Sequence, residues 1–154
     1  MTDIILNRRR LLRGSTAAAL AAFAAPALAA SYPPIAAYRN PGCSCCEKWA
    51  AHLTANGFEV TMKDDTELDK RRAAAGVPAD IAGCHTAYMS DYIIEGHVPA
   101  VDIIRFLAER PDARGLAVPG MPVGSPGMES DGAADKYDVM LFMADGLSRI
   151  YVSH

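Results

Sequence analysis

The stretch IAAYRNPGCSCC, residues 35–46, decides the fold. Residues 35–38 form a short apolar run of the kind found in buried strands. Asn40-Pro41-Gly42 is a turn signal, and apolar residues then recur at helical spacing as far as Asn56-Gly57, at Cys46, Trp49, Ala50 and Leu53. The stretch therefore predicts a strand, a tight turn and a helix that begins among three cysteines.

The next two elements follow the same alternation. Residues 58–62 place Phe58, Val60 and Met62 on one face, as a half-buried strand would. A second helix is expected to begin at Thr66, with Asp69 at the capping-box position. This helix is expected to end at Gly76.

A hairpin and a third helix follow. Residues 85–89 and 92–95 read as paired strands around Ser90-Asp91. Pro99 marks a helix start, and Pro111 marks its end. The order strand, helix, strand, helix, strand, strand, helix predicts an α/β thioredoxin-like domain over residues 31–111. Its first two strands should be parallel and its next two antiparallel.

The remaining chain predicts a C-terminal extension, residues 112–154. Residues 112–136 are rich in Pro and Gly, and loops of this length are usually functional or disordered. Residues 138–143 and 147–152 flank Ala144-Asp145-Gly146 as a second hairpin. We expect the hairpin to pack on the sheet and the loop to cover part of the functional site.

The first thirty residues have the composition of an export signal. Four arginines in residues 8–13 precede an Ala/Leu-rich run, and Ala27-Leu28-Ala29 satisfies the small-x-small cleavage rule. The run contains Pro26 and is short for a membrane span of about 20 residues. Residues 7–12 resemble a twin-arginine signal, with the general secretory route as the alternative. We therefore expect a periplasmic protein with no stable membrane insertion.

The charge balance narrows the class of partner. The 154 residues carry a formal charge of −3, and residues 1–30 hold four of the arginines. The rest of the chain is therefore acidic, which disfavours a nucleic-acid-binding surface. Its 51% hydrophobic content is enough to bury a core.

The cysteines carry the clearest chemical signal. Cys43, Cys45 and Cys46 occupy a strand-to-helix turn, where amide groups and the helix dipole favour thiolates. Cys43 and Cys46 have the CxxC spacing, so they could form a disulfide or bind a metal. Three thiolates on one turn favour a soft metal such as Cu(I), with zinc as second choice. The alternative is a redox CxxC pair with an incidental third cysteine.

Further candidate ligands lie downstream. In a thioredoxin-like layout Cys84 begins the third strand, beside the first helix. It is then either a fourth thiolate ligand or a small buried hydrophobic residue. His85 and His97 flank the predicted hairpin, although on a strand beside Cys84 the His85 ring would face the opposite side. Met121 and Met128 are further candidates, because thioethers bind copper, but methionine also fills gaps.

Four segments together resemble the CopG-type bacterial copper-resistance proteins. They are PGCSCC at residues 41–46, CHTA at 84–87, EGHVPA at 95–100 and VPGMPVGSPGM at 118–128. The resemblance covers nearly all of residues 35–153. It implies a thioredoxin-like domain whose C-terminal extension helps to bind metal, and copper ions bridged by cysteine sulfur beside the CxCC turn. It also implies interconversion of Cu(I) and Cu(II) in the envelope.

The sequence therefore predicts an exported copper-binding protein and a possible copper oxidoreductase. Its expected partners are copper ions and envelope copper-efflux or redox proteins, with no nucleic acid. Three alternatives stay open: a thiol–disulfide oxidoreductase using Cys43 and Cys46, a copper carrier without catalysis, and a structural zinc site. Carrier and catalyst need the same ligands.

Overall fold

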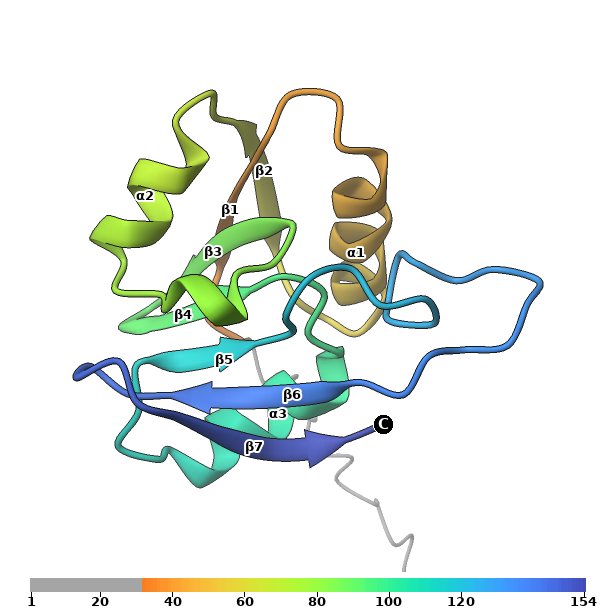
Figure 1. Cartoon of the computed structure of the whole chain (residues 1–154). Helices are drawn as coiled ribbons and strands as arrows, with labels where there is room; N and C mark the ends of the chain where they lie inside the picture. The colour runs from red at the N-terminus through yellow and green to blue at the C-terminus, as the bar shows by residue number, and fades with distance from the viewer. Residues whose placement is uncertain (1–31) are drawn as a thin grey trace, which may run out of the picture.

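The computed structural model describes residues 32–154, so the predicted export signal in residues 1–30 lies outside the described residues. Seven strands form one mixed sheet in the order β2-β1-β3-β4-β5-β6-β7 (Figure 1). The strands are β1 (Ile35–Arg39), β2 (Val60–Asp64), β3 (His85–Met89), β4 (Tyr92–Glu95), β5 (Gly115–Ala117), β6 (Asp138–Phe142) and β7 (Ser148–Ser153). The helices are α1 (Ser44–Ala55), α2 (Leu68–Ala74) and α3 (Ala100–Glu109), with a 3₁₀ turn at Ala79–Ile81.

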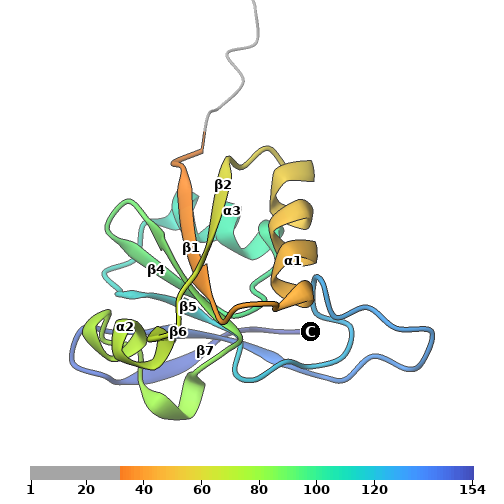
Figure 2. The same cartoon turned by 90° about the horizontal axis from the view of Figure 1, so that it is seen from above.

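The sheet is covered on both faces. The larger hydrophobic cluster joins α1 and α3 to one face, through side chains such as Trp49, Leu53 and Phe106. A smaller cluster follows α2 on the other face and includes Val77 and Ile81. Figure 2 shows α1 and α3 on one side of the strands and α2 on the other. Both faces of the central strands are therefore withdrawn from water, which is the main force holding the layers together.

Strand pairing agrees with the sequence in the first half of the chain. β1 pairs with β2 in parallel, and β3 pairs with β4 in antiparallel. The hairpin has the predicted bounds, and its turn is closed by Ser90, which has a φ of 52°. β1 also pairs antiparallel with β3, with Arg39 opposite His85. This pairing brings the start of β3 to the end of β1, where the cysteine turn begins.

The start of α2 differs from the prediction. Thr66 and Asp69 do not form a capping box, because the helix begins at Leu68 after Glu67. The carboxylate of Asp65 instead accepts the backbone N–H of Glu67 at 2.9 Å. Asp69 pairs with Arg72 at 2.7 Å one turn later. A carboxylate two residues upstream therefore satisfies the amide at the start of the helix.

The predicted loop over residues 112–136 contains a strand that the sequence analysis missed. β5 pairs in parallel with β4 and antiparallel with β6, so the C-terminal hairpin continues the same sheet. Its three residues are too few to show an alternating pattern, and tertiary pairing decides their conformation. No helix among residues 32–154 is long and apolar enough to cross a membrane.

Candidate metal centre

The CxCC turn joins β1 to α1. Cys43 lies just before the helix, and its backbone N–H donates to the carbonyl of Asn40 at 3.3 Å. Cys45 and Cys46 occupy the first turn of α1, with Cys46 fully buried and Cys45 half-buried. The buried Trp49 anchors this turn, because its indole N–H donates to the carbonyl of Val98 at 2.9 Å. The cysteines are thus fixed to the core at one end and reach the surface at the other.

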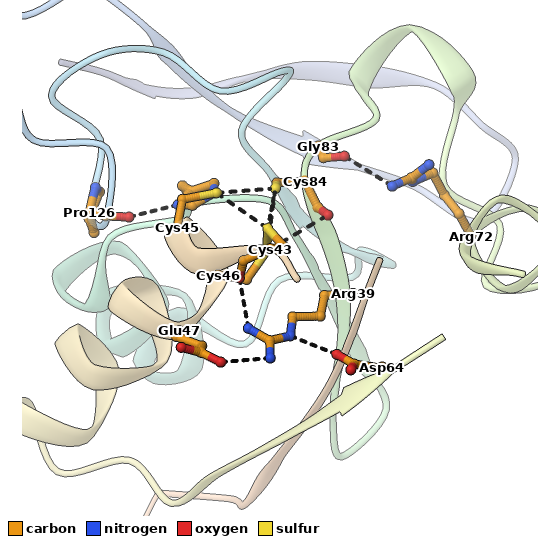
Figure 3. The surroundings of a disulfide bond; sticks show 11 residues. Arg39, Cys43, Cys45, Cys46, Glu47, Asp64, Arg72, Gly83, Cys84 and Pro126 are labelled. Carbon is orange, nitrogen blue, oxygen red and sulfur yellow. Dashed lines mark hydrogen bonds and ion pairs between the residues drawn. A yellow bond between two sulfur atoms is a disulfide. The ribbon is translucent and has the colours of Figure 1, made fainter. Parts of the chain in front are cut away.

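Cys84 brings the fourth sulfur to the same place. Its Sγ atom lies 3.1 Å from that of Cys43, 3.5 Å from that of Cys45 and 3.3 Å from that of Cys46. The Sγ atoms of Cys43 and Cys45 are 3.3 Å apart. Cys43 and Cys46 form a disulfide across a Cα separation of 5.6 Å. Figure 3 shows the four sulfur atoms turned toward one another.

A second group of ligand atoms lies beneath the first. Cys46, His85 and His97 each offer one atom, and these atoms lie within 4.8 Å of one another. The ring of His85 is 4.1 Å from that of Trp49 and 5.3 Å from that of His97, measured between centroids. Both histidines are fully buried. Cys46 belongs to both groups, so its sulfur connects the four-cysteine set to the imidazole set.

His85 joins this centre despite the expected alternation of strand faces. The prediction placed Cys84 and His85 on one strand, pointing to opposite sides. Cys84 instead lies in a bend, and β3 begins only at His85. Because strand alternation starts after Cys84, the structure lets both side chains approach Cys46.

The backbone packs unusually closely around the two histidines. A Cβ atom on Gly83 would lie 2.5 Å from the Cα atom of Gly96. A Cβ atom on Gly96 would lie 2.5 Å from the carbonyl oxygen of Val118. Glycine is therefore required at both positions, and the segments before β3, after β4 and after β5 converge. This convergence sets Cys84 and His97 beside the start of α1.

The C-terminal loop closes over the same region. His97 Nδ1 lies 2.7 Å from the carbonyl oxygen of Pro126. A Cβ atom on Gly127, whose φ is +87°, would lie 2.6 Å from the carbonyl oxygen of Cys45. Met128 is half-buried in this loop, whereas Met121 is 54% exposed. The structure therefore brings the cysteines and histidines together, sets Met128 in the covering loop and leaves Met121 largely in solvent.

Burial controls the protonation of the centre. It lowers the pKa of His85 well below the ordinary histidine value, and it lowers the pKa of His97. Burial, followed by the neighbouring Cys45 thiol, raises the pKa of Cys84 to about 12. A metal that binds Cys84 must displace its proton.

Two arginines hold the cysteine-bearing segments. Arg39 donates to the carbonyl of Cys43 at 2.7 Å and pairs with Glu47 at 2.7 Å and Asp64 at 3.0 Å (Figure 3). Arg72 donates to the carbonyl of Gly83 at 3.0 Å and pairs with the fully buried Glu95 at 2.6 Å. The sequence analysis missed both arginines, because neither residue lies in a recognisable motif.

The donor set fits a copper-binding centre. Within residues 32–154, Nδ1 and Nε2 of His85 and Nε2 of His97 are buried without a hydrogen-bond partner. Buried polar atoms without partners are costly, and an imidazole lone pair that meets a metal ion removes this cost. Thiolate sulfur and imidazole nitrogen are both copper ligands, and thiolates favour Cu(I).

Comparisons with known proteins agree with this chemistry. Two solved structures of copper resistance protein CopG, form 1 and form 2, are each 41% identical to this chain. In each case the match covers 80% of this chain and 98% of the other, with a TM-score of 0.75. The chain belongs to the CopG family of copper resistance proteins. The resemblance noted from the CxCC turn and the three downstream segments is therefore confirmed.

The other comparisons add little on chemistry. A family model described as a protein of unknown function, DUF411, matches residues 81–128. This range contains every candidate CopG-family ligand outside the CxCC turn: Cys84, His85, His97, Met121 and Met128. None of the curated proteins matches the chain.

Proposed function

We propose that this protein binds copper at a cysteine-bridged centre and interconverts Cu(I) and Cu(II) in the periplasm as part of copper resistance. The observation that carries the proposal is the convergence of Cys43, Cys45, Cys46 and Cys84, whose sulfur atoms all lie within 4.8 Å of one another. Once an external thiol or other two-electron reductant has opened the Cys43–Cys46 disulfide, such dense soft donors suit Cu(I), and one thiolate can bridge two ions. The CopG-family membership supports copper over zinc.

The buried imidazoles supply the second half of the proposed function. His85 and His97 offer nitrogen ligands beside Cys46, and nitrogen suits Cu(II) better than an all-sulfur set does. A centre with both donor types can therefore accept either oxidation state. Gain or loss of one electron per ion requires an external redox partner, for which the half-exposed Cys43, Cys45 and Cys84 provide the accessible side.

The predicted methionines take a secondary place in this proposal. Met128 follows Gly127 in the loop that packs on the start of α1, and its proposed role is a thioether ligand at the edge of the centre. Met121 is exposed, and its proposed role is to contact arriving or departing copper. We assign this loop, with β6 and β7, to an extension over residues 112–154 that completes a thioredoxin-like core over residues 31–111.

The proposed periplasmic location depends on the export signal predicted for residues 1–30. An exported protein enters an oxidising compartment, where free thiols persist only if they are bound to a metal or recycled by reduction. Copper ligation and disulfide formation are two ways to protect the cysteines of this turn. Envelope efflux and redox proteins are the proposed partners.

A thiol–disulfide oxidoreductase is the second candidate, and the Cys43–Cys46 disulfide favours it. In that function Cys43 would attack a substrate disulfide, and Cys46 would resolve the mixed disulfide. The activity would need no metal. It would also leave the fourth sulfur without a role, together with the ring nitrogens of His85 and His97 that have no hydrogen-bond partner among residues 32–154.

Anaerobic titration of the reduced protein with Cu(I), with elemental analysis against zinc, tests the proposal. We expect several copper ions per chain and a preference for copper over zinc. Potentiometric titration of the loaded protein should then show a reversible copper couple. No retained copper, together with metal-free disulfide reductase activity, would replace the proposal with the second candidate. Tight copper binding without a reversible couple would leave a carrier.

A further inference from the structure

The carboxylate of Glu95 is the most deeply buried charged group beside the centre. Its side chain has 0% exposure, yet it accepts three hydrogen bonds from three different segments. These come from Arg72 Nε at 2.6 Å, Gly83 N–H at 2.8 Å and the Thr86 hydroxyl at 2.6 Å. Two of the three donors flank Cys84 in the sequence.

Arg72 also binds the segment that contains Gly83 and Cys84. While its Nε binds Glu95, its Nη2 donates to the carbonyl of Gly83 at 3.0 Å. Both backbone polar groups of Gly83 are therefore held, the N–H by Glu95 and the carbonyl by Arg72. Figure 3 shows the contact between Arg72 and the Gly83 carbonyl. That carbonyl belongs to the peptide bond that leads into Cys84.

We propose that Arg72 and Glu95 form a buried clamp that positions Cys84 against the CxCC turn. The inference rests on the proposed copper function and deepens it, because it assigns positioning residues to the one cysteine of the centre that lies outside the CxCC turn. Cys84 lies in a bend outside β3, where an isolated β-bridge between Gly83 and Gly120 takes the place of a continuous strand ladder. The clamp adds side-chain hydrogen bonds to this bridge.

Charge balance indicates positioning rather than electrostatic attraction. The guanidinium of Arg72 is neutralised by Glu95 and also meets Asp69, whose side chain is 96% exposed. The positive charge of Arg72 lies beside the centre but is opposed there by the Glu95 carboxylate. What the guanidinium adds beyond its charge is a planar fork that reaches a carboxylate and a carbonyl at once, which an ammonium group cannot reproduce.

The neighbouring Arg71 provides a matched control. It lies on the same helix and pairs with Asp65 at 2.5 Å, and its guanidinium stacks 3.7 Å above the ring of Tyr38. The structure gives it no hydrogen bond to Gly83 or Cys84 among the described residues. Its removal therefore costs an ion pair and stacking without touching the cysteine segment.

The experiment compares Arg72→Met with Arg71→Met by chelator competition for Cu(I), with thermal unfolding and amide exchange measured in parallel. Loss of an outer partner of a metal ligand typically weakens metal affinity about 10- to 100-fold, and we expect this loss for Arg72→Met. Arg71→Met should keep the wild-type affinity. The Gly83 amide should exchange faster only in Arg72→Met. Arg72→Lys should not restore affinity, because the fork is lost.

Two further variants keep the test decisive. Arg72→Met leaves the buried Glu95 charge without its partner, which can unfold the protein. The double variant Arg72→Met/Glu95→Leu removes both charges and should fold, still with weakened copper binding. In a Cys84→Ser background, Arg72→Met should add no further loss of affinity, since the clamp acts through Cys84. Wild-type affinity in the clamp variants, or an undiminished loss without Cys84, would overturn the clamp. Failure of the wild-type protein to bind copper would instead overturn the proposed function.

Discussion

His97 Nδ1 lies 2.7 Å from the carbonyl oxygen of Pro126, and this contact ties the C-terminal loop to the centre. A carbonyl only accepts, so Nδ1 carries the proton and Nε2 keeps its lone pair. That Nε2 atom is buried without a partner in the described part of the chain. One ring thus closes the loop and presents a ligand atom in the orientation a metal requires.

Replacement of His97 by alanine should lower the number of copper ions bound per chain. The variant loses both the Nε2 ligand and the contact with Pro126, so the loop should also become more accessible to protease. His154→Ala is the control, because that ring pairs with Asp102 at 2.8 Å, away from the cysteines. Elemental analysis of loaded protein measures the effect. Equal copper content in both variants would remove His97 from the ligand set.

Cys45→Ser separates the copper function from thiol–disulfide exchange. Cys43 and Cys46 keep their CxxC pair in this variant, whereas the centre loses one of four sulfurs. We expect fewer copper ions per chain, measured after anaerobic loading, and unchanged disulfide formation. Unchanged copper content would show that Cys45 is not a copper ligand, as expected if the protein uses Cys43 and Cys46 only as a redox CxxC pair.

Gly127→Ala should destabilise the protein and weaken copper binding. Its φ is +87°, and an added Cβ would meet the carbonyl oxygen of Cys45 at 2.6 Å. Gly120→Ala is a matched control, since its φ is +67° but no atom lies within 4 Å of the added Cβ. Backbone strain alone costs about 1–2 kcal/mol, and the clash at Gly127 should add to it. Urea unfolding compares the two, and equal losses would exclude close packing of the loop on α1.

The buried histidines should make the metal-free protein less stable in acid. Burial lowers the pKa of both His85 and His97, so below about pH 6.5 the unfolded chain binds protons that the folded chain does not. The unfolding free energy should therefore fall as pH drops through that value, by up to about 1.4 kcal/mol per pH unit for each histidine. Urea unfolding at neutral pH and at about pH 5 tests this expectation. In a His85→Phe variant the unfolding free energy should fall less steeply with decreasing pH. An equal slope in the variant and the wild-type protein would contradict a role for His85.

Local patterns were enough to predict much of the fold. The strand, turn and helix around residues 35–46, and the hairpin with its Ser90-Asp91 turn, follow from short-range periodicity and turn chemistry. β5 could not be predicted in the same way, because three residues carry no period and their pairing with β4 is a long-range contact. The predicted capping box of α2 was wrong, because the Asp65 carboxylate rather than Thr66 accepts the backbone N–H at the start of the helix.

Only part of the candidate centre could be predicted from the sequence. Cysteine, histidine and methionine are metal-binding residue types, so the candidate ligands could be selected by residue type and spacing. Arg72 and Glu95 were not, because arginine and glutamate are ordinary surface residues until folding buries them. A glutamate inside a predicted strand, next to apolar residues such as Ile93 and Ile94, was the available signal.

X-ray absorption at the copper edge of the loaded protein tests the central claim most directly. The account predicts a first shell dominated by sulfur, a smaller nitrogen contribution from imidazole, and a nearby second copper joined by bridging sulfur. Loss of the sulfur shell in a variant lacking the CxCC cysteines should accompany loss of the metal. A first shell of nitrogen and oxygen alone, with no sulfur, would contradict a cysteine-bridged copper centre.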